Sequence, residues 1–457
     1  MKKILITLFF VSVFLLSFFP VKDTDFGWHY RCGKEFLTSG SLCIKNNFSY
    51  FLPNYQTYYP GHLYDIIISF VYDHWGFLGI SFIGSIIFTL AALVFIKIMS
   101  NKEIGFITYF ISFTLSYSIF NLGFRPQIIT YLFLFILLWV LESKNKRLFF
   151  FVPILFLFWV NLHIGFFIGL FVLTFFVFHE GKGINRSQKL FIIFISFLTT
   201  LINPFGINVY REIFNHFTSP LGQMIAEWVR PSPLHLFLII FLTVIGLIII
   251  IKQKPINLFY LLLLISFSFL SLNARRNLPF FYPVFFYVIR TPLNKFRIKL
   301  IPLGLLIPIL CSIIIFVLII YVPQTMKFDT SWAEYCQKGQ IIYPCQAIKK
   351  FPQLIDNVFN TYEWGGFLIW QKSNIRVFVD GRMPAWKDEN GKSPYQVFLE
   401  IIQTQPGWNE KLNKWQTNYL LITNSTFLDL LLQKESNKYN WQEVYRDNTA
   451  VIYKKKD

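Results

Sequence analysis

Long apolar stretches, separated by short polar loops, fill this chain up to residue 322. They show neither the strict alternation of a half-buried strand nor the polar face of a surface helix. We therefore expect helices that cross a membrane. Because several stretches are shorter than the ~20 residues needed to span hydrocarbon, we expect some to be broken or re-entrant. We predict about eleven spans, at residues 4–20, 77–98, 104–121, 128–141, 148–160, 164–178, 190–202, 234–251, 256–272, 278–289 and 300–322.

The first stretch could also be read as a cleaved secretory signal. Its end, Ser17-Phe18-Phe19-Pro20, lacks the small-residue pattern of a cleavage site, and polar residues follow at once. This favours a retained first helix.

The pattern changes after residue 322, where the apolar runs become shorter. Four segments alternate as strands do, and residues 426–433 have the spacing of a helix. This predicts a small α/β domain over residues 323–457. The four expected strands are residues 376–380, 418–423, 441–446 and 450–454.

Residues 1–322 are then one α-helical membrane domain, which includes a long first loop, residues 21–76. Within this loop, residues 63–75 carry apolar side chains at helical spacing, broken by Asp65, Asp73 and His74. We expect an amphipathic helix that lies at the membrane surface.

The composition is typical of a multi-pass membrane protein, and the placement of its charges argues against a nucleic-acid-binding protein. Of the 457 residues, 54% are hydrophobic and only 14% are charged, with a mean hydropathy of +0.50. The net charge of +18 comes largely from Lys and Arg in alternate loops, which marks those loops as cytoplasmic. Because the basic clusters flank apolar spans, they report topology, and no nucleic-acid partner is implied.

This topology places the N-terminus inside, and the first loop and the C-terminal domain outside the cytoplasmic membrane. Four of the five cysteines lie in these two outer regions, as the close pairs Cys32 with Cys43 and Cys336 with Cys345. We predict two local disulfides in an oxidising compartment, with unrelated free thiols as the alternative. The absence of C-x₂-C spacing argues against a zinc site.

The acidic motif Asp23-Thr24-Asp25 follows directly on the first apolar span. Carboxylates are costly to keep near hydrocarbon, so a function explains them better than packing does. Catalysis by Asp25, with Asp23 assisting, competes with a role for Asp25 as a helix cap or as a partner of Arg31.

Arginines at the outer ends of spans run against the positive-inside bias, and these are Arg125, Arg275 and Arg276. A guanidinium fork matches phosphate oxygens, so an anionic phosphate ligand explains them. The alternative is that they extend along the helix ends to the interface.

Other polar residues also collect at the outer side, whereas scattered structural residues would populate both faces. The histidines could be buried hydrogen-bonding residues, and the asparagines could satisfy backbone groups at broken helices. The remaining candidates, for sugar contact, support of the site or the acceptor, are Gln127, His29, His62, Asn161, His163, Asn203, Glu227, Asp380 and Arg382.

In order and spacing, these motifs resemble the GT-C superfamily of integral-membrane glycosyltransferases, and more closely a bacterial group of GT-C-like membrane proteins. The superfamily includes protein mannosyltransferases, aminoarabinose transferases and the catalytic subunit of oligosaccharyltransferase. The resemblance covers the membrane part and reaches into the C-terminal domain. It is carried by Asp23-Thr24-Asp25, Trp28-His29, Gly33, Gly61-His62, Arg125-Pro126-Gln127, Asn161-Leu162-His163, Asn203-Pro204-Phe205-Gly206, Glu227-Trp228 and Asp380-Gly381-Arg382.

The resemblance implies transfer of a sugar from a polyprenyl-phosphate-linked donor to a glycan, lipid or protein acceptor outside the cytoplasm. Asp25 or Asp23 would supply the catalytic base in an inverting single displacement, while arginines stabilise the departing phosphate. Asp380 and Arg382 would lie on the acceptor side.

A divalent metal, Mg²⁺ or Mn²⁺, is also consistent with the resemblance, because some members bind one at the acidic motif. Here Asp23 and Asp25 with His62 or Asp65 would hold it. Tyr362-Glu363-Trp364-Gly365-Gly366 is loosely similar to the acceptor-recognition motif of oligosaccharyltransferase but lacks its Trp-Trp-Asp-Tyr-Gly pattern, so asparagine is not implied as acceptor.

Two further classes stay open. A transporter or flippase for a lipid-linked glycan also needs a basic, aromatic cavity, but it should carry polar residues through both leaflets, and few lie in the cytoplasmic half. A non-catalytic envelope-assembly protein could use its outer domain to bind an enzyme.

Overall fold

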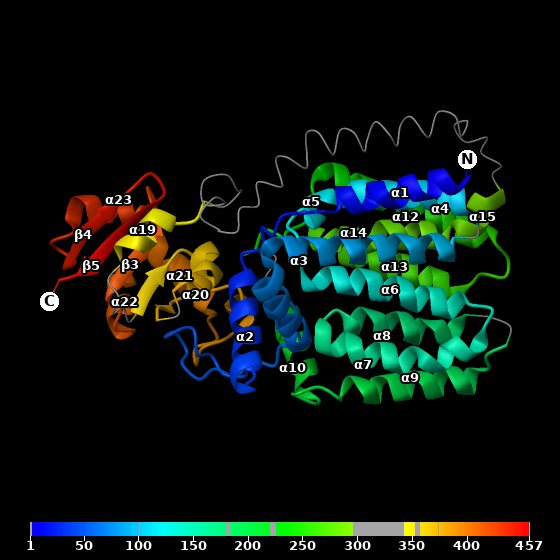
Figure 1. The fold of residues 1–457 in the computed structure, drawn as a ribbon, viewed down its shortest axis with the longest axis horizontal. Coiled ribbons are helices and arrows are strands. Elements are labelled where there is room, and N and C mark those ends of the chain that lie inside the picture. Colours follow the sequence, from blue (N-terminus) through cyan, green and yellow to red (C-terminus); the bar gives the residue numbers. More distant parts are fainter. Residues whose placement is uncertain are drawn as a thin grey trace. The chain divides into compact units, whose positions relative to one another are not determined.

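The computed structural model shows a mainly helical chain with one small sheet (Figure 1). It describes residues 2–99, 101–179, 183–219, 225–295, 342–351, 357–372 and 374–456. The chain forms two compact units. We call Met1–Val21, Phe77–Val209 and Pro220–Lys327 the helical unit, and Lys22–Gly76, Tyr210–Ser219 and Phe328–Asp457 the sheet unit. The first outer loop therefore folds with the C-terminal residues.

The helical unit is a set of apolar helices. Each predicted span that lies within the described residues coincides with helix, while the span predicted over residues 300–322 lies outside them. The elements are α1 (Lys2–Leu16), the second part of α3 (His62–Ile98), α4 (Lys102–Leu115), α5 (Tyr117–Phe120), α6 (Pro126–Glu142), η1 (Lys146–Phe151), α7 (Val152–Leu162), α8 (Phe166–Phe175), η2 (Phe176–Phe178), α9 (Arg186–Thr200), α12 (Pro233–Lys252), α13 (Leu258–Asn273), η3 (Arg275–Asn277), α14 (Leu278–Val288) and α15 (Arg290–Lys295).

Polar residues at the loop ends set where these helices begin. Asn101 caps α4 and Asn257 caps α13, each accepting a backbone N–H of the first turn, and Asn185 forms a capping box with Gln188 at the start of α9. Pro126 starts α6, where the missing N–H costs nothing.

Two helices within the described residues, α3 and α12, are long and apolar enough to cross a membrane. Others are shorter: α8 has 10 residues and α7 has 11. The number of spanning helices therefore stays a prediction.

The helix predicted over residues 63–75 belongs to the sheet unit. This helix runs directly into the next apolar span, so that both form α3 with a break at Gly76 (φ 60°, ψ −156°). Such a backbone conformation is open to glycine at little steric cost. The break at Gly76 is also a boundary between the two units.

A five-stranded sheet with helices forms the C-terminal part, as predicted for an α/β domain. Strand order is β2-β1-β3-β5-β4; β1 pairs in parallel with β2 and β3, whereas β5 is antiparallel to β3 and β4. The strands are β1 (Asn357–Asn360), β2 (Arg376–Val377), β3 (Tyr419–Thr423), β4 (Trp441–Arg446) and β5 (Ala450–Lys455).

The helices of the sheet unit include several that the sequence pattern did not predict. Their apolar faces are short: α21, for example, has nine residues and starts at a Ser393 capping box. The predicted helix over residues 426–433 is α23 (Phe427–Glu435). The other helices of the unit are α2 (Phe26–Ser39), α10 (Asn208–Thr218, shared with the helical unit), α19 (Cys345–Lys350), η5 (Tyr362–Trp364), α20 (Gly365–Gln371), η6 (Met383–Ala385), α21 (Pro394–Ile402) and α22 (Trp408–Lys414).

The predicted strand at 376–380 is shorter than expected, and the sheet has one strand, β1, that was not expected. Phe378 N–H still donates to Val358 O of β1, but the Asn360 side-chain oxygen accepts from Phe378 N–H and from Val379 N–H, so regular backbone pairing ends there. β1 has only four residues, too few to show an alternating pattern.

Candidate functional site

The acidic motif lies at the start of α2, in the sheet unit. Asp25 is the residue that precedes the helix, yet its side chain makes no capping hydrogen bond; instead its backbone N–H donates to Asp23 Oδ1 at 3.2 Å. Asp23 is 6% exposed. The structure thus excludes the simple capping role for the Asp25 carboxylate, and it places the Asp23 carboxylate against the backbone N–H of Asp25.

Three glycines bring this motif against two motifs of the C-terminal part. A Cβ atom on Gly381 would overlap the Asp25 carboxylate, one on Gly366 would overlap Thr24 O, and one on Gly27 would overlap Gly366 O. None of the three has a positive φ. Space rather than backbone conformation therefore requires glycine at these positions.

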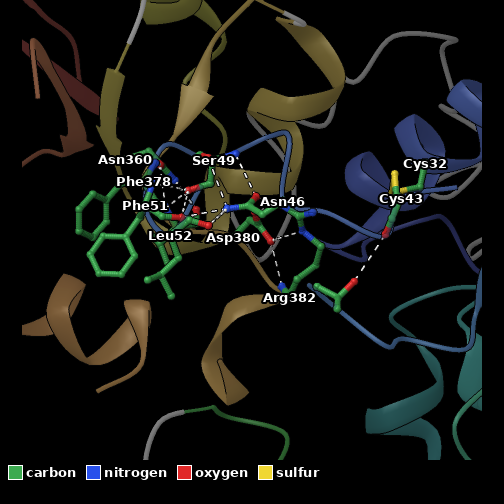
Figure 2. Close-up of polar contacts among 12 residues, drawn as sticks. Cys32, Cys43, Asn46, Ser49, Phe51, Leu52, Asn360, Phe378, Asp380 and Arg382 are labelled. Atoms are coloured by element: carbon green, nitrogen blue, oxygen red, sulfur yellow. Dashed lines mark hydrogen bonds and ion pairs between the residues drawn. A yellow bond between two sulfur atoms is a disulfide. The ribbon is translucent and has the colours of Figure 1, made fainter. Parts of the chain in front are cut away.

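The Asp380-Gly381-Arg382 motif is organised by its own ion pair. Arg382 Nε donates to Asp380 Oδ1 at 2.8 Å, and Arg382 Nη2 donates to Oδ2 at 2.7 Å (Figure 2). The guanidinium also lies 5.0 Å from the ring of Phe48 and 5.3 Å from that of Trp386. Asp380 is fully buried. Both charged groups are thus committed to each other, which gives this turn a fixed shape.

The segment around Asn46 connects the first loop to this turn. Asn46 Nδ2 donates to the carbonyls of Phe51 and Leu52 at 2.9 and 3.0 Å, and its Oδ1 accepts from Arg382 Nη2 at 3.4 Å (Figure 2). Ser49 pairs in parallel with Val377. The first loop is therefore an added edge of the C-terminal sheet.

A disulfide between Cys32 and Cys43 ties this segment to α2, with a Cα–Cα distance of 5.4 Å. The first predicted disulfide is confirmed. The second cannot be followed, because Cys336 lies outside the described residues.

Two histidines of the first loop, His29 and His62, are buried. His29 Nδ1 and Asp65 Oδ1 are 2.5 Å apart, both residues are buried, and the Trp28 ring stacks on His29 with centroids 3.6 Å apart. His62, at the start of α3, is also buried. His29 and Asp65 thus join α2 to α3, which agrees with the hydrogen-bonding alternative for His29.

Three tyrosines, Tyr59, Tyr343 and Tyr362, lie close enough to the acidic motif to interact with its carboxylates. Burial raises the pKa of Tyr59, Tyr343 and Tyr362 well above the ordinary value, and nearby carboxylates that include Asp25 add to the rise in each case. These phenols stay protonated at any physiological pH and remain hydrogen-bond donors. Two of them adjoin motifs that were noted, at Gly61-His62 and within Tyr362-Glu363-Trp364.

The metal expected at the acidic motif finds no ready ligand set. Among the described residues, no three His, Cys, Asp or Glu side chains are grouped so that they could hold an ion. Asp65 is instead paired with His29.

The predicted arginines gather in the helical unit. Arg125, which precedes α6, forms an ion pair with Glu227, and the backbone N–H of Arg276 donates to Glu227 O at 3.2 Å. The Arg276 guanidinium lies 4.4 Å from the Trp228 ring, while Arg275 N donates to Val229 O at 2.9 Å. Short backbone hydrogen bonds thus join η3 to the Glu227 segment.

A small pocket opens at this cluster, and we call it the arginine pocket. Its polar lining comprises Arg125, Gln127, Glu227 and Arg276, and its apolar wall includes Phe120 and Phe280. Burial alone would raise the pKa of the Glu227 carboxyl, but the charges of Arg125 and Arg276 hold it below the ordinary value. Two cations therefore face one carboxylate. Within the part of the chain that the structure describes, the buried Gln127 Oε1 has no hydrogen-bond partner.

The remaining candidates, Asn161, His163 and Asn203, satisfy polar groups at helix ends. Asn161 Nδ2 donates to Leu157 O and Ile202 O at 2.9 and 3.0 Å. Asn203 Nδ2 donates to Thr200 O at 2.7 Å, and His163 Nδ1 lies 2.7 Å from Thr130 Oγ1. None of the three lines the arginine pocket. These contacts agree with the structural alternative.

The fold is similar to that of solved oligosaccharyltransferases from Archaeoglobus fulgidus. One, the archaeal oligosaccharyltransferase AglB in complex with an inhibitory peptide and a dolichol-phosphate, matches with a TM-score of 0.58 and 11% identity, over 96% of this chain and 71% of that one. A second, tethered by a disulfide bond to an acceptor peptide containing the NVT sequon, gives a TM-score of 0.60 and 12% identity, over 100% and 74%.

The apo form of the same archaeal enzyme gives a TM-score of 0.56 and 13% identity, over 96% of this chain and 70% of that chain. No family model and no curated protein matches the sequence. At these identities the similarity is one of fold. The chain thus has a fold similar to that of the archaeal oligosaccharyltransferases.

Proposed function

We propose that this protein is a membrane glycosyltransferase that moves a sugar from a polyprenyl-phosphate-linked donor to an acceptor outside the cytoplasm. The observation that carries the proposal is the arginine pocket, where two guanidiniums meet a single carboxylate in a GT-C-type fold. One solved protein of this fold is described in complex with a dolichol-phosphate. Such a pocket suits an anionic phosphate, since the guanidinium keeps its charge and matches phosphate oxygens.

The reaction is an inverting single displacement. The acceptor hydroxyl oxygen forms a bond to the anomeric carbon of the sugar while the bond from that carbon to the phosphate oxygen breaks. The acceptor proton passes to the Asp25 carboxylate, and the bonding electrons leave with the lipid phosphate. Arg125 and Arg276 stabilise the negative charge that grows on that phosphate.

Asp25 suits the role of base because its carboxylate does not cap α2. Asp23 lies next to it and assists. Asp380 and Arg382 were expected to contact the acceptor. Because their side chains pair with each other, we propose instead that they hold the shape of the turn against which the Asp25 carboxylate lies. The acceptor is a glycan, a lipid or a protein; the archaeal neighbour was tethered with a peptide.

The location follows the same reasoning. The disulfide between Cys32 and Cys43 fits an oxidising compartment, which supports the sheet unit lying outside the cytoplasmic membrane. The helices α3 and α12 support a membrane protein. The Lys and Arg residues of alternate loops support an N-terminus inside.

The test is sugar transfer by the purified protein in lipid nanodiscs, with a panel of radiolabelled polyprenyl-phosphate sugars. Asp25→Asn should lower the rate by about 10²–10⁴-fold, the usual contribution of a general base, without weakening donor binding. Glu410→Gln, at an exposed carboxylate on α22, is the matched control and should leave the rate unchanged. Parallel reactions with EDTA determine whether Mg²⁺ or Mn²⁺ is needed. Donor binding without transfer across the whole panel would reject the enzyme and favour a transporter or an assembly protein.

A further inference from the structure

The helix α10 (Asn208–Thr218) exposes large apolar side chains, which a surface helix of a water-soluble protein would bury. Phe214 and Phe217 are 66% and 62% exposed, and Ile207, directly before the helix, is 58% exposed. The charged Glu212 is instead buried, at 5% exposure. With Tyr210, these apolar side chains follow the spacing of one helical face, which we call the aromatic face of α10.

The opposite face of α10 is packed against protein. It carries Val209, fully buried, and Ile213, 5% exposed. His216 Nδ1 lies 3.5 Å from Glu212 Oε1, one turn away on the same side. The helix therefore turns Glu212 toward the protein and its phenylalanines outward.

Water is an unfavourable surrounding for such a face. A cluster of exposed aromatic side chains marks a surface that another apolar phase covers. The neighbours of α10 in the chain indicate which phase this is: α9 precedes it with Phe191 and Phe194 each 58% exposed, and α12 follows with Leu234 66% and Phe237 61% exposed. Residues 201–207 between α9 and α10 can span at most about 25 Å when fully extended. The chain thus joins α10 on both sides to helices whose exposed apolar side chains also need an apolar surrounding.

We propose that α10 binds the lipid surface, with Tyr210, Phe214 and Phe217 inserted at the boundary between headgroups and acyl chains. This rests on the membrane location given under the proposed function. Amphipathic helices of this kind lie in the plane of the interface, and aromatic rings favour that depth.

An exposed residue of α10, Arg211, gives this lipid contact a consequence for the site. The Arg211 guanidinium lies 6.0 Å from the Tyr58 ring, in the first outer loop. In the same loop, Tyr55 stacks on Trp386 at 4.5 Å, and Trp386 lies against Arg382. Lipid bound to α10 therefore restrains the segment Tyr55–Tyr58 that supports the Asp380–Arg382 turn.

The test is photocrosslinking with p-benzoylphenylalanine in place of Phe214 or Phe217, in the full chain in nanodiscs of phosphatidylglycerol and phosphatidylcholine. Phe237, on the spanning helix α12, is the positive control. Phe427, 69% exposed on α23, is the negative control because it is an equally exposed aromatic residue. Mass spectrometry identifies the adducts. We expect lipid adducts at positions 214, 217 and 237, and at least tenfold fewer at 427.

The controls separate failure of this inference from failure of the proposed function. Lipid adducts at 237 but not at 214 or 217 would overturn the inference for α10 alone. Crosslinks from 214 to a second copy of the chain or to another protein would also overturn it, since they identify a protein partner. If 237 yields no lipid adduct, the membrane location is wrong, and the inference falls with it.

Discussion

The Asp25 carboxylate lies against the α-carbon of Gly381, in the space that any side chain at position 381 would need. The first acidic motif and the Asp380-Gly381-Arg382 turn are more than 350 residues apart in the chain, yet the structure makes each part of the other's surroundings. Two further close approaches, between Thr24 and Gly366 and between Gly27 and Gly366, hold the start of α2 in the same place.

A methyl group at Gly381 should therefore displace the base. We expect Gly381→Ala to lower the transfer rate by about 100-fold, because a displacement of about 1 Å at a reacting group can cost this much. Gly391→Ala is the matched control: its φ of 77° strains an alanine, but no atom lies within 4 Å of the new Cβ. It should lower the melting temperature and leave the rate of the folded protein unchanged. Equal losses of rate in the two variants would contradict the role of Gly381.

Arg276 should contribute to donor binding through its planar fork. We expect Arg276→Lys to weaken binding of a polyprenyl phosphate by about 10- to 100-fold, the value of one or two charge-assisted hydrogen bonds. Arg230→Lys, at an exposed arginine near Glu227 in the chain, is the control and should bind as the wild type does. Equilibrium binding of a fluorescent polyprenyl phosphate measures both. An unchanged affinity in Arg276→Lys would place the phosphate elsewhere.

The Glu227 carboxyl should make the helical unit sensitive to acid. Its pKa in the folded protein lies below the ordinary value of 4.5. The stabilisation is therefore complete above pH 4.5 and is lost as the pH falls through the lower folded pKa. Comparing melting temperatures of wild type and Glu227→Gln between pH 7 and pH 3 isolates this effect. The difference between the two proteins should be constant above about pH 5 and should shrink below it. A difference that grows on acidification would have the wrong sign.

The disulfide between Cys32 and Cys43 should stabilise the sheet unit. Its ends are 11 residues apart, and closing such a loop contributes about 2–3 kcal/mol in the chain-entropy model. We expect the Cys32→Ser, Cys43→Ser double variant to melt at a lower temperature in non-reducing buffer. Hydrogen exchange should localise the loss of protection to residues 40–57. The single variants serve as controls for the substituted side chains. Equal stability of the double variant and the wild type would show that the loop needs no crosslink.

Much of the architecture was predictable because it depends on local pattern. Continuous apolar runs gave helices at each predicted span that the structure describes, and the alternation after residue 357 gave β3, β4 and β5 nearly at their bounds. The close spacing of Cys32 and Cys43 was enough to predict their disulfide. Short elements such as β1 were missed because four residues carry too little periodicity.

The roles of single polar residues were harder to predict. Asn161, Asn203 and His29 were candidates for sugar contact or for support of the site, with a structural hydrogen bond as the alternative, and the structure shows a hydrogen-bond partner for each. Tyr59 and Tyr343 were not noted, because a tyrosine in a chain with 23 tyrosines gives no signal until its neighbours are known.

The amino-acid sequence by itself determined the helices, the sheet-forming C-terminal part, the acidic motif and the unusual arginines, since each follows from neighbouring residues along the chain. Only the tertiary structure decided that the first outer loop joins the C-terminal sheet, that Asp25 lies on Gly381, and that Arg125 and Arg276 share a pocket with Glu227. The physical reason is that contacts between distant segments depend on how surfaces fit together. That fit is set by space, as at the three glycines, and by charge pairing, as at Glu227; neither leaves a periodic trace in the sequence.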